Sequence, residues 1–282
     1  MLLGAHMSIS GGLHLSLERG RSIGCTAIQI FTKNASQWRA KPITDEDISA
    51  YLEMQAETGI GPVVAHDSYL INLASSDRAL FEKSYDAFRI EMQRAESLGI
   101  PHLVTHPGAH KGAGEEEGIR LISGALTRLH RDTPGFNVKV CLETTAGQGT
   151  SLGHTFEQIA RMIELTEESD RLSVCLDTCH VFVASYPLST VEEYHSTMDE
   201  FDRIIGLDRL AVIHLNDAKK GAGSRVDRHE HIGKGEMGLE AFRGIMNDKR
   251  LDDVPKLLET HKGKDMEEDV MNMDVLKSLV EN

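Results

Sequence analysis

The feature that most constrains the fold is a regular repeat of short apolar runs along the whole chain. Eight runs occur at an average step of about 36 residues, and each is followed by a turn signal and a segment with helical spacing. Strands that alternate with helices in this way predict a parallel sheet covered by helices. The runs span residues 2–5, 27–31, 63–65, 103–105, 138–142, 172–176, 210–213 and 254–258.

Eight regular units favour closure into one (β/α)8 TIM barrel over an open, doubly wound sheet. The chain of 282 residues, of which 40% are hydrophobic, is long enough to bury one large core, so we expect a single domain over residues 1–282. A dinucleotide-binding fold is not favoured, because no G-x-G-x-x-G follows the first run. We expect a helix at 77–98, ended by Gly99, and a last barrel helix within 265–282.

The composition disfavours several classes of protein. No apolar run approaches the roughly 18 residues of a membrane span, and residues 1–10 carry no basic segment, so we expect a cytoplasmic protein that contacts no membrane. Four cysteines are too few for a disulfide framework. The end of a strand separates Cys175 from Cys179, so we expect buried thiols and not a cysteine-ligated metal. A net charge of −14 means that nucleic-acid binding would need a local basic or metal-rich face.

The residues that end the apolar runs carry the functional signal, because barrel active sites lie at the carboxyl ends of the strands. Seven runs are followed directly by a histidine or a carboxylate. Only the second run, whose last residue is Phe31, is not. One such residue is most simply a satisfied polar group on the barrel rim. Carboxylates clustered at one mouth repel one another unless protons or cations compensate, which indicates a multinuclear metal centre. The seven residues are His6, His66, His106, Glu143, Asp177, His214 and Glu259.

Nitrogen and oxygen ligands without thiolates suit zinc, with manganese or iron as alternatives. His180 lies three residues beyond the sixth run, and Asp227 and His229 form a pair in the loop after the seventh run, although a solvated loop turn explains this pair equally well. The enlarged set indicates at least two ions and is compatible with three. Such clusters hydrolyse phosphate esters, with Glu143 and Asp177 as bridging carboxylates, whereas sugar isomerisation on a two-ion barrel is the competing chemistry.

Five longer sequence blocks contain most of these residues. They are HDSYLINL at 66–73, ETTAGQG at 143–149, LDTCH at 176–180, HLNDAK at 214–219 and the block at 223–235 that contains Asp227, Arg228 and His229. Through these blocks the chain resembles the endonuclease IV family of abasic-site DNA repair endonucleases over nearly its full length.

The resemblance implies a trinuclear zinc centre, in which manganese could replace one ion. His6 is left over, and we interpret it as a residue that supports the ligands. The ligand sets implied by the resemblance are His66, His106 and Glu143 for the first ion, Glu143, Asp177, His214 and Glu259 for the second, and His180, Asp227 and His229 for the third.

The reaction implied by the resemblance is hydrolysis of the phosphodiester on the 5′ side of an abasic site in duplex DNA, which leaves a 3′-hydroxyl and a 5′-deoxyribose phosphate. A hydroxide held between two ions would attack phosphorus, with Glu259 orienting or deprotonating it and with Glu143 and Asp177 in the centre. The resemblance also suggests a monomer. The alternative enzyme is a divalent-metal sugar isomerase or epimerase on a similar barrel, and the non-enzymatic alternative is a damage-binding protein without turnover.

The resemblance also implies the DNA contacts. Family members push side chains into the DNA and flip out the abasic nucleotide, and Tyr69 and Leu70 match that wedge. A second loop provides Lys33, Asn34, Ser36, Gln37 and Trp38, and the block at 223–235 provides Arg228. We expect the basic residues of the loops after the strands to offset the acidic composition on this face, namely Lys33, Arg39, Lys111, Lys219, Lys220, Arg225, Arg228 and Lys262.

Ser36 departs from the family pattern, because well-studied bacterial relatives insert an arginine at this position. The missing cation predicts weaker clamping of the damaged site, unless Arg39 or Trp38 supplies the contact. We therefore expect Ser36→Arg to bind a duplex with an abasic-site analogue several-fold more tightly than the wild type. A salt titration of the dissociation constant checks this, and a variant that binds no more tightly at any salt concentration would remove the idea.

Overall fold

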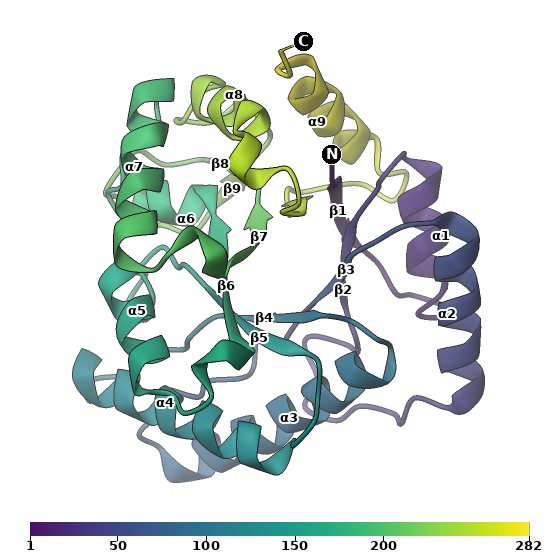
Figure 1. Cartoon of the computed structure of the whole chain (residues 1–282), viewed down its shortest axis with the longest axis vertical. Coiled ribbons are helices and arrows are strands. Elements are labelled where there is room, and N and C mark those ends of the chain that lie inside the picture. Colours follow the sequence, from purple (N-terminus) through teal and green to yellow (C-terminus); the bar gives the residue numbers. More distant parts are fainter. Residues whose placement is uncertain (282) are drawn as a thin grey trace.

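Eight parallel strands close into a barrel in the computed structural model, which describes residues 1–281 and confirms the predicted fold class (Figure 1). Neighbouring strands follow the order β1, β10, β7, β6, β5, β4, β3, β2 around the barrel. Asn282, the last residue of the predicted domain and of the predicted final helix, lies outside the described residues. The barrel strands are β1 (Leu3–Met7), β2 (Ile28–Phe31), β3 (Val63–His66), β4 (His102–Thr105), β5 (Lys139–Glu143), β6 (Leu172–Asp177), β7 (Leu210–His214) and β10 (Lys256–Leu258).

Helices surround the barrel, and a small antiparallel sheet of β8 (Asp217–Ala218) and β9 (His229–Glu230) follows β7 (Figure 1). The predicted helix 77–98 is α3: Asp77 caps its first turn, and Gly99 ends it with a φ of +65°. Within residues 1–281, no helix is both long and apolar enough to cross a membrane. The helices are α1 (Leu15–Ser22), α2 (Asp45–Thr58), α3 (Arg78–Ser97), α4 (Glu115–Asp132), α5 (Phe156–Leu165), α6 (Thr178–Val183), α7 (Val191–Ile204), α8 (Glu240–Asn247) and α9 (Glu267–Ser278).

Two separate apolar clusters fill the two sides of the barrel sheet. In β6, Val174 and Leu176 belong to the large cluster that includes the helices, whereas Cys175 between them belongs to the small cluster. Because successive side chains of a strand point to opposite faces, the small cluster fills the barrel interior. It consists of Ala27, Val64, Val104, Cys141, Cys175, Val212 and Leu257.

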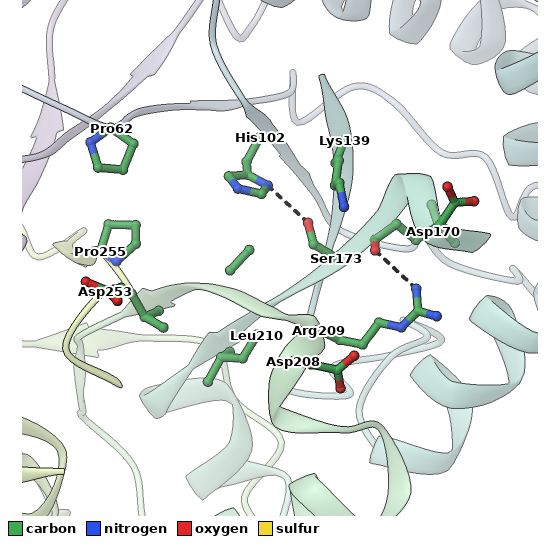
Figure 2. A pocket seen from close by; sticks show the side chains of 13 residues that line it. Pro62, His102, Lys139, Asp170, Ser173, Asp208, Arg209, Leu210, Asp253 and Pro255 are labelled. Atoms are coloured by element: carbon green, nitrogen blue, oxygen red, sulfur yellow. Dashed lines mark hydrogen bonds between the residues drawn. The ribbon is translucent and has the colours of Figure 1, made fainter. Parts of the chain in front are cut away.

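The end of the barrel at which the strands begin carries a cavity of about 510 Å³ (Figure 2). His102 Nδ1 lies 3.2 Å from Ser173 Oγ there, and Arg209 donates to the carbonyl oxygen of Leu172 at 3.4 Å. These polar groups therefore have partners within the protein. Residues at this end of a barrel generally serve stability, and the described lining contains none of the predicted ligands.

Gly4 in β1 lies against the backbone of Ala27, the residue before β2. A Cβ atom at this position would lie 1.8 Å from the carbonyl oxygen of Ala27. Overpacking against side chains that can yield costs roughly 1–3 kcal/mol, so we expect Gly4→Ala to lower the free energy of unfolding by about 3 kcal/mol or more against a backbone atom. Urea unfolding measures the change.

The matched control is Gly124→Ala in α4, because Gly124 is exposed and has open space around it. It is expected to raise the free energy of unfolding by up to about 1 kcal/mol through helix propensity. Equal stability of Gly4→Ala and the wild type would contradict the close packing of β1 on β2.

Candidate metal centre

Six predicted ligands lie two residues beyond members of the interior cluster. Side chains two residues apart on a strand share a face, so each polar group follows its apolar partner along the inside of the barrel. Four of the strands end on a predicted ligand, one residue beyond the predicted apolar run, because backbone pairing continues through the polar residue, as between Asp177 and His214. The pairs are Val64 with His66, Val104 with His106, Cys141 with Glu143, Cys175 with Asp177, Val212 with His214 and Leu257 with Glu259.

His66, His106 and Glu143 form the first ligand group. Nε2 of His66 and Nε2 of His106 each lie 3.1 Å from Glu143 Oε2. Glu143 is fully buried, whereas the His106 side chain is 41% exposed, so the group reaches solvent on one side. The three ligand atoms lie within 4.8 Å of one another, which is compatible with one shared ion.

Glu143, Asp177, His214 and Glu259 form the second group. His214 Nδ1 lies 3.0 Å from Glu143 Oε1, 3.1 Å from Glu259 Oε2 and 3.9 Å from Asp177 Oδ2. Glu143 therefore turns one oxygen toward the first group and the other toward the second. This is the arrangement of a bridging carboxylate.

His180, Asp227 and His229 form the third group. His180 and His229 direct Nε2 to Asp227 Oδ1 at 3.2 and 3.4 Å. His180 lies in α6 and His229 in β9, so regular elements hold both imidazoles. A solvated turn does not describe this pair, because the His229 side chain is only 18% exposed and faces the cluster.

The imidazoles of this cluster are oriented as metal ligands. In three of them the ring nitrogen that points away from the cluster lies near an oxygen acceptor. When this nitrogen carries the proton and donates it to that oxygen, the nitrogen that faces the cluster keeps a free lone pair. The contacts are His66 Nδ1 to the Asp67 carbonyl oxygen at 2.9 Å, His180 Nδ1 to the Thr144 carbonyl oxygen at 2.8 Å and His214 Nε2 to Gln29 Oε1 at 2.8 Å.

Two of the cluster-facing nitrogens support this interpretation directly. Nε2 of His180 and Nε2 of His229 are buried, and within the described residues neither has a partner with the geometry of a hydrogen bond, although both lie near Asp227 Oδ1. Buried polar atoms are nearly always paired, so a pair of orphaned nitrogens beside a carboxylate fits a bound cation. The residues present therefore fit the metal ions implied by the sequence.

Carboxylates and imidazoles shift one another's pKa values in this cluster. Burial lowers the pKa of His66, but the hydrogen bond to Glu143 and the Glu143 charge outweigh it and raise the pKa to about 10. Burial raises the pKa of Glu143, yet the charges of His106 and His214 bring it well below its usual range. The site therefore has a strong demand for positive charge, which divalent ions satisfy.

The chain is similar to known proteins in sequence and in structure. A family described as xylose isomerase-like TIM barrel matches residues 17–279. The chain is 53% identical over 278 residues to probable endonuclease 4 of Chloroflexus aurantiacus, with 99% of this chain and 98% of the relative covered. It is 54% identical over 278 residues to probable endonuclease 4 of Geobacter sulfurreducens, with 99% and 94% covered.

Endonuclease IV from Thermus thermophilus has the same structure with a TM-score of 0.88 at 33% identity, covering 99% of this chain and 98% of that chain. The chain belongs to the endonuclease IV family. The family and the class of enzyme predicted from the sequence are thereby confirmed. D-psicose 3-epimerase from Clostridium cellulolyticum has a TM-score of 0.70 at 14% identity, over 100% of both chains, which is a likeness of fold alone.

Gln29 is the functional residue that the sequence analysis of this endonuclease IV family member missed. It is fully buried in β2, where its Oε1 accepts from His214 Nε2 at 2.8 Å and its Nε2 donates to Glu259 Oε1 at 2.6 Å. One amide thereby orients a ligand histidine and the predicted catalytic carboxylate. The signal was a single amide inside the apolar second run.

His6 lies within β1, because the strand continues to Met7 beyond the predicted run. Its Nδ1 lies 3.0 Å from Gln29 Nε2 and 3.8 Å from Glu259 Oε1, and it belongs to none of the ligand groups found in the described residues. Phe31 packs against the His6 ring with 4.4 Å between ring centroids. The second run therefore ends in Phe31, an aromatic residue that packs on His6 beside the candidate centre. This explains why no histidine or carboxylate follows the second run.

The predicted DNA-contacting residues lie around the mouth above the ligand groups. A cavity of about 340 Å³ opens there, and Tyr69, which is 72% exposed, forms part of its lining. Tyr69 packs edge-on against Phe31 with 5.3 Å between ring centroids. Of the other predicted contacts, Leu70 and Trp38 are half-buried, and Asn34, Ser36, Gln37 and Arg228 are exposed.

Two of the expected rim cations contribute no free charge to this face. Lys33 is buried, and its Nζ lies 3.3 Å from Glu91 Oε1. Lys262 Nζ donates to the His6 carbonyl oxygen at 2.6 Å and to Asp269 Oδ2 at 2.5 Å. The expectation of free charge from these two lysines is wrong, because partners inside the protein neutralise them. The other expected cations are exposed: Arg39, Lys111, Lys219, Lys220, Arg225 and Arg228.

All four cysteines are free and buried. Sγ of Cys175 and Sγ of Cys179 each lie within 4.8 Å of ligand atoms of the cluster. Burial raises the pKa of both thiols, so they stay protonated and are weaker ligands than the neighbouring carboxylates and imidazoles.

Gln29→Met is expected to weaken zinc binding by about 10- to 100-fold, because the second group loses the partner that orients His214 and Glu259. Competition between the metal-free protein and a chromophoric chelator measures the affinity. Gln93→Met, on the exposed face of α3, is the control. Equal zinc affinity of Gln29→Met and the wild type would contradict the orienting role of the amide.

Proposed function

We propose that this member of the endonuclease IV family, acting as one barrel domain over residues 1–282, is a DNA repair endonuclease that hydrolyses the phosphodiester 5′ to abasic sites in duplex DNA. The products are a 3′-hydroxyl and a 5′-deoxyribose phosphate. The centre holds three zinc ions, one of which manganese can replace. The cytoplasmic location and the monomeric state expected from the sequence stay predictions.

The observation that carries this proposal is the third ligand group beside the first two. A sugar epimerase or isomerase on the same barrel needs one or two ions and an enclosed pocket. His180, Asp227 and His229 provide a further donor set that such a reaction does not require. Tyr69 is exposed at the edge of the mouth, where a small sugar in the centre would not contact it. The third ligand group and the exposed Tyr69 both suit a polymer that lies across an open metal centre.

Three sets of side chains would hold the ions: His66, His106 and Glu143; Glu143, Asp177, His214 and Glu259; and His180, Asp227 and His229. Divalent ions bound there would lower the pKa of a water molecule toward neutrality and neutralise the charge that develops on the phosphate oxygens. Glu143 and Asp177 keep the sets together, because each carboxylate lies within 4 Å of histidines from two sets.

Glu259 is the residue that acts on the attacking water. Burial raises its pKa, but the charge of His214, the hydrogen bond to His6 and the charge of His66 together outweigh burial and lower the pKa below its usual range, so the carboxylate is ionised. Gln29 Nε2 donates a hydrogen bond to Glu259 Oε1 at 2.6 Å and thereby fixes the plane of the Glu259 carboxylate. An ionised, rigid carboxylate accepts a hydrogen bond from water and orients its lone pair, and so favours orientation over strong proton abstraction.

The wild type is expected to cut an end-labelled duplex with one tetrahydrofuran abasic analogue on the 5′ side of the lesion and to leave the undamaged duplex intact. Glu259→Gln is expected to cut about 10²- to 10⁴-fold more slowly, because a neutral amide is a weaker hydrogen-bond acceptor than the carboxylate that orients the attacking water. A denaturing gel resolves the products and gives the rates.

Glu240→Gln, an exposed substitution in α8, is the control for loss of one negative charge. Equal rates for Glu259→Gln and the wild type would remove Glu259 from the reaction. If the zinc-loaded wild type cuts neither duplex, the endonuclease proposal fails and a screen of sugar substrates comes next.

Asp227→Ala is expected to hold one zinc ion fewer per chain than the wild type and to lose most cleavage, because His180 and His229 alone bind an ion weakly. Elemental analysis of dialysed protein gives the metal content. Asp208→Ala, at the opposite end of the barrel, is the matched control. Equal zinc content of Asp227→Ala and the wild type would contradict a third site.

A further inference from the structure

Helix α3 joins two loops that carry predicted DNA contacts. The loop at 32–41 follows β2 and includes Trp38, and the segment at 67–73 follows β3 and includes Tyr69. Both reach the same buried side chain of α3, Glu91, which is 1% exposed and takes no part in the ligand groups.

Glu91 uses both carboxylate oxygens in this junction. Its Oε1 lies 3.3 Å from Lys33 Nζ and accepts a hydrogen bond from the Ser68 backbone N–H at 3.1 Å. Its Oε2 accepts from Thr32 Oγ1 at 3.4 Å. One carboxylate therefore connects the start of the first loop to the start of the second.

Lys33 extends the connection to the tip of its loop. Its Nζ donates to the carbonyl oxygen of Gln37 at 2.8 Å and contacts the carbonyl oxygen of Asn34 at 3.4 Å. Together with Glu91, these oxygens occupy the three donors of the ammonium group. Ser68 Oγ donates to the Ala35 carbonyl oxygen at 2.5 Å, which links the two loops directly.

Arg94 holds the far end of the first loop from the same side of α3. Its Nε donates to the Thr32 carbonyl oxygen at 3.2 Å, and its Nη1 donates to the Lys41 carbonyl oxygen at 2.7 Å. Residues three apart on a helix are neighbours on its surface, so Glu91 and Arg94 act as one anchoring surface. Both ends of the loop at 32–41 are thereby attached to one helix.

Stability alone gives little reason for the buried pair of Lys33 and Glu91. Removing two charges from water is costly, and a well-packed apolar pair in the same place is often equally stable or more stable. A hydrogen-bonded pair of fixed geometry instead sets the distance between the loops. Loops that are ordered before they bind do not lose that conformational entropy on binding.

We propose that Glu91 is a positioning residue that holds the Trp38 loop and the Tyr69 segment in the arrangement that binds damaged DNA. This inference rests on the proposed function. It also gives Lys33 a role inside the protein: this cation connects Glu91 to the tip of the loop and does not contact phosphate directly.

Trp38 makes the arrangement observable without DNA or turnover. It is the one tryptophan of the chain, and Lys83 Nζ of α3 lies 4.2 Å from the centre of its ring. Glu91→Gln keeps the shape of the side chain and removes its charge. We expect this variant to shift Trp38 emission to the red and to raise its quenching by acrylamide about twofold or more, because the loop opens locally.

In the DNA arm, Glu91→Gln is expected to raise KM for the tetrahydrofuran duplex about tenfold or more, while kcat at saturating DNA stays within about twofold and the zinc content is unchanged. The combined substitution Lys33→Met with Glu91→Met leaves no unpaired buried charge, so it folds where the single variant does not. It is expected to show the same changes in Trp38 quenching and KM.

Asp248→Asn is the matched control. Asp248 is a buried carboxylate paired with Arg250 at 2.7 Å, and its other partner is the Tyr194 hydroxyl, away from both loops. This variant loses the ion pair of a buried carboxylate whose cation is exposed, and it is expected to change thermal stability without changing Trp38 quenching or KM.

Unchanged Trp38 quenching and KM in a folded Glu91 variant overturn the proposal. Loss of zinc or of kcat at unchanged KM also overturns it, because Glu91 would then act on the metal centre. If the wild type neither binds nor cuts the abasic duplex, the proposed function fails, and the role of Glu91 in DNA binding fails with it. Failure of the proposed function can be told from failure of the Glu91 proposal alone, because the first shows in the wild type and the second only in the Glu91 variants.

Discussion

The alternation of side chains along eight closed parallel strands is the constraint on which the rest of the structure depends. Every second side chain points inward, and the interior of the barrel is too narrow to leave these groups apart. Small apolar residues such as Val64 and Cys141 fill one layer, and His66 and Glu143 then meet in the next layer. Closure of the sheet therefore forces ionisable groups together that belong to distant parts of the chain.

Glu143 stands at the centre of this layer, and its surroundings decide its charge. Burial alone favours the neutral acid, whereas His106 and His214 favour the carboxylate and win. A carboxylate that is ionised and dehydrated needs cations on both oxygens, which the geometry permits because His66 and His214 approach different oxygens. The same demand explains why neighbouring imidazoles direct their other nitrogens to fixed oxygen acceptors.

The barrel repeat and the clustering of the predicted ligands were predictable, because both depend on periodicity and on the position of a residue relative to a strand end. Gln29 was not predicted, because an amide inside a strand has no visible purpose until His214 and Glu259 are known to lie beside it. Lys33 was assigned to the surface because its partner, Glu91, lies on a helix three elements further along the chain. The position of His180 in α6 and not in a loop was also invisible, because the helix is only six residues long. In each case the decisive information is a contact between segments distant in sequence.

Burial of the centre also bears on how damage is distinguished from intact DNA. Glu143 and His214 are fully buried, and the cavity of about 340 Å³ at the mouth is lined by other candidate ligands such as His66 and Glu259. In the reaction we propose, a phosphodiester in a stacked duplex would not reach candidate ligands at this depth, whereas a nucleotide turned out of the helix would. Turning a nucleotide out of the helix is least costly where no base is paired. An abasic nucleotide would therefore reach the buried centre more easily than an intact one. Under the proposed function, selectivity would arise at the mouth, from the loops attached to α3 through Glu91 and Arg94, and the chemistry inside would need no means of recognising a missing base.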